Sequence, residues 1–348
     1  MISPLSGSRP PVEVFDVALL DLDGVVYIGP HVVEHAAESI RQGRERGMRF
    51  GFVTNNAARL PSEVAAHLCE IDVPAQPHDV VTSSQAGARL LAERLAPGAP
   101  VLAVGGPGVA LSLVEHGLRP VTSVDDAPLA ILQGFGRDVG WQHLAEASLA
   151  VRRGAYWVAT NLDATFPVPG GRAPGNGMLV AAVAEAGGRW PDAVAGKPHA
   201  PLMVESVERL EAARPIVVGD RLDTDIAGAD GLGIASLLVL TGVTDVARLL
   251  AAPADERPSL IARDMRGLLE SHPTVEHTAG EWRARSSRAR VLDGVLQVQH
   301  GPGREGWEDA VRCACAAAWS ISDLDTHAAA VMLEQDRPEG PSRLATER

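Results

Sequence analysis

Short runs of consecutive hydrophobic residues alternate, over the first two thirds of the chain, with longer stretches whose hydrophobic positions recur at helical spacing. Each short run is typical of a strand buried on both faces of a parallel sheet, and each longer stretch predicts a connecting helix. Strands are predicted at residues 15–20, 49–53, 80–82, 215–218 and 235–240, and helices at 33–46, 62–71, 84–95 and 199–210. This order predicts an α/β fold with a Rossmann-like parallel-sheet core.

A second set of strands and helices interrupts this core. Its start is marked by the Pro- and Gly-rich stretch 96–100, and its end by Gly196-Lys197-Pro198. Strands are predicted at residues 101–104, 129–132 and 156–160, helices at 110–116, 141–152 and 178–186, and a Pro- and Gly-rich loop at 166–177. We therefore expect a core formed by residues 12–96 and 196–265, with an inserted α/β domain at 97–195.

The last 79 residues follow a different pattern. Residues 291–299 alternate like a single strand, and residues 306–320 have the spacing of an amphipathic helix. We expect a small α+β appendage at 270–333 and a disordered tail at 334–348, where polar and charged residues dominate. Cys313 and Cys315 lie in an alanine-rich helical run, which favours a packed pair over a metal site.

Composition limits the classes of function. The 348 residues are 46% hydrophobic and carry a formal net charge of −13, which disfavours nucleic-acid and membrane partners but permits a small phosphorylated substrate. Three cysteines are too few for a disulfide framework, and no hydrophobic run reaches the roughly 20 residues of a membrane span. We expect a cytoplasmic protein, which could self-associate through the inserted domain or the C-terminal region.

Polar side chains stand where the predicted core strands end. Asp21 and Asp23 follow the first strand, and Thr54 and Asn55 follow the second. Asp220 follows the strand predicted at residues 215–218. In open α/β sheets ligands bind beyond the carboxyl ends of the strands, so these side chains are expected to share one crevice. Taken singly, each would be an ordinary turn residue.

The residue types suit phosphoryl transfer. Carboxylates are ligands that Mg²⁺ accepts together with water and phosphate oxygens, and Lys197 is a point charge suited to a phosphoryl oxygen. A carboxylate beside a metal and a phosphate can act as a nucleophile and form an aspartyl-phosphate. A second carboxylate two residues later can protonate the leaving oxygen and then activate water.

Four motifs in this order resemble those of the haloacid dehalogenase superfamily of phosphatases: DLDGV at residues 21–25 with Leu20 before it, TNN at 54–56, GKP at 196–198 and GDRLDTD at 219–225. The insertion resembles the α/β cap of the branch that contains nucleotide, phosphoglycolate and pyridoxal-phosphate phosphatases. The resemblance covers roughly residues 14–265. The C-terminal region resembles an incomplete acetyltransferase fold, but the acetyl-CoA loop pattern is absent around residues 299–306, so we infer a docking or dimerisation surface there and no acyl transfer.

The resemblance implies a role for each motif residue. Asp21 would be the nucleophile and Asp23 the general acid/base, with its backbone carbonyl on the metal. Thr54 and Lys197 would hold the phosphoryl group, with Asn55 beside them. Asp220 would complete the Mg²⁺ site with Asp21 and Asp23, and Asp225 would belong to the site either behind Asp220 or bound to the metal through water. Asp223 is expected at the surface or as a helix N-cap.

A non-enzyme remains as an alternative from another class. A receiver-like module or another non-catalytic, ligand-binding module also accepts phosphate on a strand-end aspartate beside Mg²⁺ and a lysine. Such a module needs no inserted domain and lacks the second aspartate of the Asp21-x-Asp23 pair.

The substrate is expected to be a small phosphorylated metabolite, since a cap over a small crevice excludes macromolecules. Asn161, Asp163 and Asn176 in the insertion suit hydroxyl groups, and no aromatic cluster at 156–177 offers a stacking surface for a base or pyridine ring. Together with the resemblance, this favours glycerol 3-phosphate over phosphoglycolate, pyridoxal phosphate and nucleotides.

Overall fold

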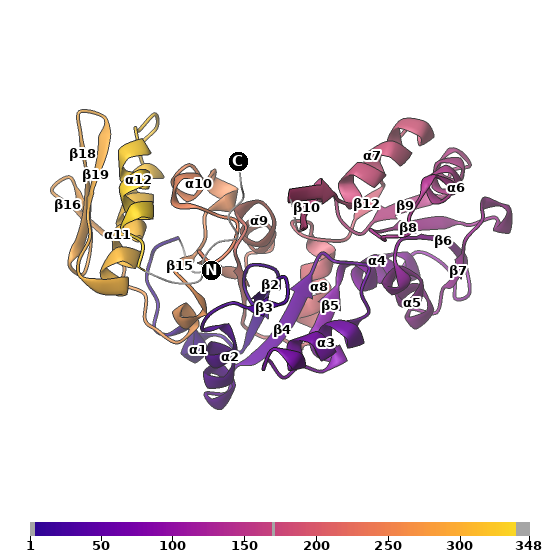
Figure 1. The fold of residues 1–348 in the computed structure, drawn as a ribbon, viewed down its shortest axis with the longest axis horizontal. Helices are drawn as coiled ribbons and strands as arrows, with labels where there is room; N and C mark the ends of the chain where they lie inside the picture. Colours follow the sequence, from indigo (N-terminus) through magenta and orange to yellow (C-terminus); the bar gives the residue numbers. More distant parts are fainter. Residues whose placement is uncertain (1–3, 169–170, 339–348) are drawn as a thin grey trace. The chain divides into compact units, whose positions relative to one another are not determined.

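The computed structural model describes residues 4–168 and 171–338 (Figure 1). The chain divides into two compact units, each built around its own parallel strands. Among the described residues, unit 1 comprises residues 4–50 and 212–338, and unit 2 comprises residues 51–168 and 171–211. Among the described residues, no helix has both the length and the apolar character needed to cross a membrane.

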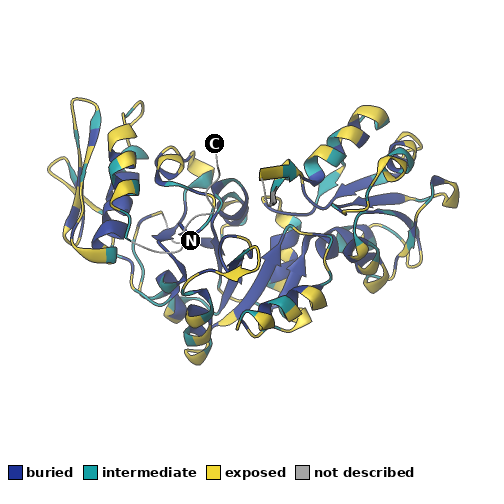
Figure 2. Cartoon of the chain, viewed as in Figure 1, coloured by how far each residue is buried: buried dark blue, intermediate teal, exposed yellow. Residues whose placement is uncertain are grey.

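The parallel strands of unit 1 run in the order β15-β14-β13-β1. They are β1 (Val17–Leu20), β13 (Pro215–Gly219), β14 (Ala235–Val239) and β15 (Leu260–Ala262), and β4 (Arg49–Thr54) begins in this unit. Almost every residue in these strands is buried, as expected for strands covered on both faces (Figure 2). The predicted α/β fold with a parallel sheet is confirmed, and β15 is a strand that the hydrophobic pattern did not predict.

Short helices and one hairpin complete this part of unit 1. They are α1 (Pro11–Val14), α2 (Ala36–Glu45), the hairpin β2 (Tyr27–Ile28) and β3 (His31–Val32), α9 (Ala227–Asp230), α10 (Val246–Leu250), the 3₁₀ turns η4 (Ala254–Glu256) and η5 (Met265–Leu268), and the π-helical turn η3 (Leu222–Ile226).

The C-terminal region folds as an antiparallel sheet covered by helices. The sheet contains, in order, β16 (Glu276–Thr278), β17 (Glu281–Ala284), β18 (Ser287–Leu292) and β19 (Val295–Gln299), and it is followed by α11 (Gly303–Ala318) and α12 (His327–Gln335). The predicted amphipathic helix is confirmed as α11. The boundary predicted at Glu334 falls inside α12, whereas residues 339–348 of the predicted tail lie outside the described residues.

The prediction of one strand at residues 291–299 is wrong. The chain turns back at Asp293 and Gly294, whose φ angles are 51° and 77°, so β18 and β19 form a hairpin. Two consecutive positive φ angles are characteristic of a type I′ turn, for which Asp-Gly is a preferred pair. The alternation of hydrophobic and polar residues continued across this turn and concealed it.

The C-terminal region shares one hydrophobic core with the parallel sheet of unit 1. Trp307 and Leu333 from the C-terminal helices belong to the same buried cluster as Leu222, Ile226 and Leu240. Cys313 and Cys315 also lie in this cluster as free thiols, and burial raises the pKa of Cys313 to about 12. The expected packed cysteine pair is thus present, and the appendage is continuous with the core in its packing.

Unit 2 contains a five-stranded parallel sheet in the order β12-β9-β8-β6-β7 and the strand pair β4-β5. Its elements are β5 (Val80–Thr82), β6 (Pro100–Val104), β7 (Arg119–Val121), β8 (Ala130–Gln133), β9 (Tyr156–Ala159), β12 (Ala193–Val194), α3 (Pro61–Glu70), α4 (Ser83–Ala92), α5 (Pro107–Glu115), α6 (Trp141–Arg152), α7 (Asn176–Gly187), α8 (Ala200–Arg209), and the 3₁₀ turns η1 (Pro77–Asp79) and η2 (Val124–Asp126). The hydrophobic core formed by this sheet together with α6 and α7 contains Trp157, Ile131 and Val180.

The Pro- and Gly-rich stretch that was predicted as a loop contains a hairpin. The strands β10 (Thr165–Val168) and β11 (Gly171–Pro174) pair antiparallel, and residues 169–170 between them lie outside the described residues. The sequence did not indicate these strands because it contains Pro167 and Pro174, and proline is rare in strands except at edges and ends.

Candidate active site

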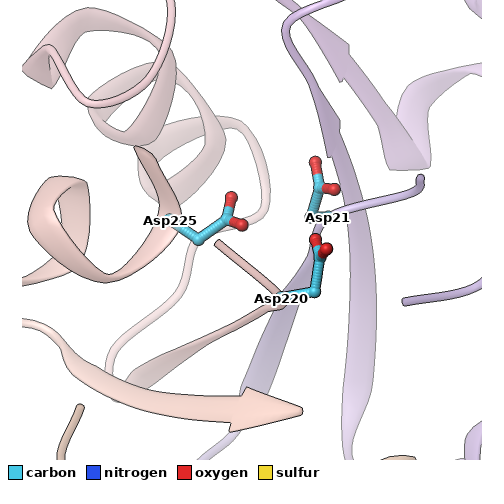
Figure 3. A group of neighbouring side chains, drawn as sticks. All are labelled: Asp21, Asp220 and Asp225. Atoms are coloured by element: carbon cyan, nitrogen blue, oxygen red, sulfur yellow. The ribbon is translucent and has the colours of Figure 1, made fainter. Parts of the chain in front are cut away.

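Three carboxylates meet at the carboxyl ends of β1 and β13. The two strands are parallel neighbours, with Leu20 opposite Val218, so the residues that follow them emerge side by side. One oxygen each from Asp21, Asp220 and Asp225 lies within 4.8 Å of the others (Figure 3). The structure therefore brings these three predicted site residues together.

Asp225 reaches this group from the π-helical turn η3. Its carboxylate Oδ2 accepts the backbone N–H of Arg221 at 3.1 Å, which turns the side chain back toward the strand end. Single π-helical turns are frequent at functional sites because they redirect a side chain without ending the helix. Asp223 in the same turn instead pairs with the guanidinium of Arg221 at 2.9 Å and is half-exposed, as predicted for a surface residue.

Asp220 is fully buried and lacks full hydrogen bonding. Its Oδ2 accepts the backbone N–H of Val243 at 2.6 Å, but its Oδ1 has no hydrogen-bond partner among the described residues. Burial raises the pKa of this carboxyl well above its usual value, and the negative charges of Asp225 and Asp21 raise it further. A buried, incompletely bonded carboxylate beside two others fits a hard cation such as Mg²⁺.

Two glycines pack directly against Asp220. A Cβ atom added at Gly24 would lie 2.7 Å from Asp220 Oδ2, and one added at Gly242 would lie 1.9 Å from it. Gly24 also has a φ of 89°, which a larger residue adopts only with strain. These positions fix the orientation of the carboxylate by close packing.

Asp23 stands in the turn that Gly24 closes. The N–H of Gly24 donates to the carbonyl of Tyr27 at 2.8 Å. Asp23, which belongs to unit 1, is an exposed residue. An exposed carboxyl two residues from Asp21 suits proton exchange with water.

Lys197 and Thr54 are buried in unit 2. Lys197 Nζ donates to the carbonyl of Val53 at 3.3 Å, next to Thr54 at the end of β4. Thr54 Oγ1 accepts the N–H of Asn56 at 3.0 Å, which makes a tight turn of the TNN motif. The structure thus places the end of β4 and the lysine of GKP together, although they are far apart in sequence.

Asn55 uses its side chain to hold Lys197. Its Oδ1 accepts the backbone N–H of Lys197 at 2.8 Å, and its Nδ2 donates to the Lys197 carbonyl at 3.1 Å and to Asp163 Oδ2 at 3.0 Å. A primary amide has two N–H donors, so both are in use. The geometry places Asn55 beside Lys197 in a positioning role, and a contact of Asn55 with phosphate stays a prediction.

Asn161 and Asn176 continue this network into the insertion. Asn161 Nδ2 donates to the carbonyl of Asn55 at 2.8 Å, and Asn176 Nδ2 donates to the carbonyl of Asn161 at 2.8 Å. Ser83 Oγ also donates to the Asn55 carbonyl, at 2.7 Å. No motif includes Ser83, which directly precedes the helix predicted at residues 84–95, so its contact with Asn55 was not predicted.

The predicted site residues therefore form two groups. Asp21, Asp23, Asp220 and Asp225 lie in unit 1, and Thr54, Asn55, Asn161 and Lys197 lie in unit 2. Within each group, side chains from distant parts of the chain are brought together by strand ends.

Similarity to known proteins identifies the family. Residues 18–119 match the family of haloacid dehalogenase-like hydrolases, and residues 194–268 match a second, HAD-hydrolase-like family. The D-glycerol 3-phosphate phosphatase of Mycobacterium tuberculosis is 49% identical over 253 residues, which cover 73% of this chain and 70% of the relative. The chain belongs to the haloacid dehalogenase-like hydrolases. An acid sugar phosphatase of Staphylococcus aureus is 36% identical, over 67% of this chain and 89% of its own.

Solved structures of this family share the fold. The glycerol phosphate phosphatase of Mycobacterium tuberculosis in complex with magnesium matches with a TM-score of 0.84 and 41% identity, over 94% of this chain and 98% of that one. The match must therefore include most of the C-terminal region. The p-nitrophenyl phosphatase of Archaeoglobus fulgidus matches with a TM-score of 0.68 and 28% identity, over 73% of this chain and 98% of its own.

Proposed function

We propose that this chain is a Mg²⁺-dependent phosphatase that hydrolyses D-glycerol 3-phosphate through an aspartyl-phosphate. The observation that carries the proposal is the group formed by Asp21, Asp220 and Asp225, with its buried, incompletely bonded oxygen on Asp220. The relative that is 49% identical has this activity in its name, and its family includes a phosphatase structure that contains magnesium.

In the first half-reaction, a carboxylate oxygen of Asp21 attacks the phosphorus, and the bond from phosphorus to the glycerol oxygen breaks. Asp23 gives its proton to the departing glycerol oxygen. In the second half-reaction, Asp23 takes a proton from water, which attacks the phosphorus, releases inorganic phosphate and restores the Asp21 carboxylate. One group thus serves as acid and then as base.

The remaining residues have supporting roles. Asp21, Asp220, Asp225 and the backbone carbonyl of Asp23 would hold Mg²⁺, which when bound offsets the negative charge of the carboxylates and the phosphoryl group. Lys197 and the hydroxyl of Thr54 would bind phosphoryl oxygens. Asn55 and Asn161 would keep Lys197 in place. Burial of Lys197 supports this role, since a cation removed from water interacts more strongly with an anion.

The choice of substrate rests on the relative and on the polar insertion. Asn161, Asp163 and Asn176 make this part of the insertion polar, as suits a small polyol, but Asn161 and Asn176 already bond to backbone carbonyls, so the relative carries most of the choice. Sugar phosphates form the second candidate, because the acid sugar phosphatase is 36% identical. Three free cysteines support a reaction in the reducing cytoplasm. The net charge of −13 supports a small phosphorylated metabolite as partner over a nucleic acid or an anionic membrane. Self-association through the cap or the C-terminal region would be measured by light scattering.

A panel of phosphate esters compared by kcat/KM tests the proposal. D-glycerol 3-phosphate is expected to exceed its L-enantiomer, phosphoglycolate, pyridoxal phosphate, a hexose phosphate and a nucleoside monophosphate. A chelator should stop phosphate release, and added Mg²⁺ should restore it. A clear preference for another ester would overturn the substrate, and a stable phosphoenzyme without turnover would favour the receiver-like alternative.

A further inference from the structure

The loop between β14 and α10 passes beside Asp220. The N–H of Val243 donates to Asp220 Oδ2 at 2.6 Å, and the N–H of Thr244 donates to the Asp220 carbonyl at 3.2 Å. The hydroxyl of Thr241 donates to the carbonyl of Gly24 at 2.5 Å, so the same loop also holds the turn after Asp21. The position of residues 240–246 therefore determines the direction of the Asp220 carboxylate.

The end of α12 and the residues directly after it are bonded to both ends of this loop. The guanidinium of Arg337 donates to the carbonyl of Leu240, and Glu334 Oε1 accepts the N–H of Val246 at 2.8 Å. Arg337 and Glu334 also form an ion pair at 3.7 Å. α12 packs against α10, which begins where the loop ends (Figure 1).

α12 is itself anchored in the core of unit 1. Leu333 is fully buried, and the indole N–H of Trp307 donates to the Leu333 carbonyl at 2.7 Å. The guanidinium of Arg337 lies over the Trp307 ring, 5.8 Å from its centroid. One face of α12, with Ala329, Ala330 and Leu333, is therefore buried in the core. This anchoring distinguishes its contacts with the loop from an isolated surface ion pair, which would contribute little.

We propose that α12 positions Asp220 for Mg²⁺ binding through the loop 240–246, and that Glu334 and Arg337 are positioning residues of the metal site. The proposal rests on the proposed function, because it takes Asp21, Asp220 and Asp225 as metal ligands. Glu334 and Arg337 bond to the backbone of the loop, one step removed from the Asp220 carboxylate. The helix is therefore expected to adjust metal affinity and not to be indispensable for catalysis.

Calorimetric titration of the full chain with Mg²⁺, without substrate, tests this role. Glu334→Ala and Arg337→Ala should each raise the Kd for Mg²⁺ by about 3- to 10-fold, less than the 10- to 100-fold typical of residues one layer closer to a metal. Glu334→Gln keeps an acceptor for the Val246 N–H and should bind within about two-fold of the original chain. At saturating Mg²⁺, kcat should be largely restored.

Asp336→Asn is the matched control, since Asp336 lies between the two residues and pairs with His300 at 3.3 Å. Its Kd for Mg²⁺ should not change. If an alanine variant does not fold, Glu334→Asp and Arg337→Lys take its place, with an expected weakening of about 2- to 5-fold. If folded alanine variants of Glu334 and Arg337 bind Mg²⁺ as tightly as the control, this inference is overturned and the proposed function is not. If the unaltered chain binds no Mg²⁺, the proposed function is overturned as well.

Discussion

The carboxylate group of unit 1 and the amide network of unit 2 are both buried and polar, but they differ in how well their hydrogen bonds are satisfied. Within the part of the chain that the structure describes, Asp220 has an oxygen without a hydrogen-bond partner and two like charges beside it. Asn55, by contrast, uses its oxygen and both amide protons on protein atoms. Buried polar groups are normally satisfied, so an unpartnered charged oxygen beside two like charges favours a cation there, whereas the complete set of bonds on Asn55 favours a positioning role. The neutral Asn176 Oδ1 in the same network has no hydrogen-bond partner among the described residues either, so the contrast rests on charge as well as on bonding. We therefore propose that the first group holds a cation and that the second maintains its own geometry.

The largest effect on kcat is expected at Asp21, which the proposed reaction requires as the nucleophile. Asp21→Asn should reduce kcat by about 10⁴-fold or more, because an amide cannot form the aspartyl-phosphate. Turnover and acid-quenched phosphoenzyme would be measured together. Asp223→Asn is the control. Asp223 lies in the π-helical turn that contains Asp225 but pairs with Arg221, so its substitution should leave kcat within about two-fold. Substantial turnover by the Asp21 variant would exclude it as the nucleophile.

A smaller effect is expected from the amide network of unit 2. Asn55→Ala removes three hydrogen bonds that hold Lys197 and Asp163, so kcat/KM should fall by about 10- to 100-fold, through misplacement of the lysine. The Kd for Mg²⁺ in the absence of substrate should stay within about two-fold. Ser83→Ala removes one bond to the Asn55 carbonyl and should have a weaker effect. Equal loss of Mg²⁺ binding would contradict the distinction between the two groups.

Much of the carboxylate group could be predicted from sequence because its determinants are local. A buried run that ends in Asp-x-Asp-Gly or Gly-Asp places its polar residues at a strand end, and parallel pairing aligns such ends. The participation of Asp225 followed only from the family resemblance, since its direction depends on the π-helical turn at Leu222–Ile226. Periodicity contains no signal for such a turn.

The amide network of unit 2 and the contacts of Glu334 in unit 1 could not be predicted, because most of these bonds join a side chain to a backbone group that is distant in the sequence. Asn55 and Lys197 are 142 positions apart, and Val246 and Glu334 are 88 positions apart. Backbone atoms are present at every residue, so the sequence does not indicate which of them will accept or donate to a side chain. The turn at Asp293 and Gly294, by contrast, has a local signal, which the uninterrupted alternation around it obscured.

The smallest effect concerns stability without metal. Asp220→Asn should raise the free energy of unfolding of the metal-free protein by roughly 1–2 kcal/mol, because it removes a buried charge that faces Asp21 and Asp225. The amide still accepts the N–H of Val243 and offers donors to the two carboxylates. Urea unfolding with and without Mg²⁺ measures the change, with Asp223→Asn expected within about 0.5 kcal/mol.

The same substitution should change how stability depends on pH. The pKa of Asp220 is higher in the folded chain than in the unfolded chain, so the folded state binds more protons between the two values. The metal-free protein should therefore lose stability as pH rises from the ordinary carboxyl pKa through the raised pKa of Asp220, and the asparagine variant should lack this component. Mg²⁺ should stabilise the original chain above that range and leave the variant nearly unchanged. A metal-free variant less stable than the original chain would mean that Asp220 is already satisfied without a cation, and the contrast between the two polar groups would disappear.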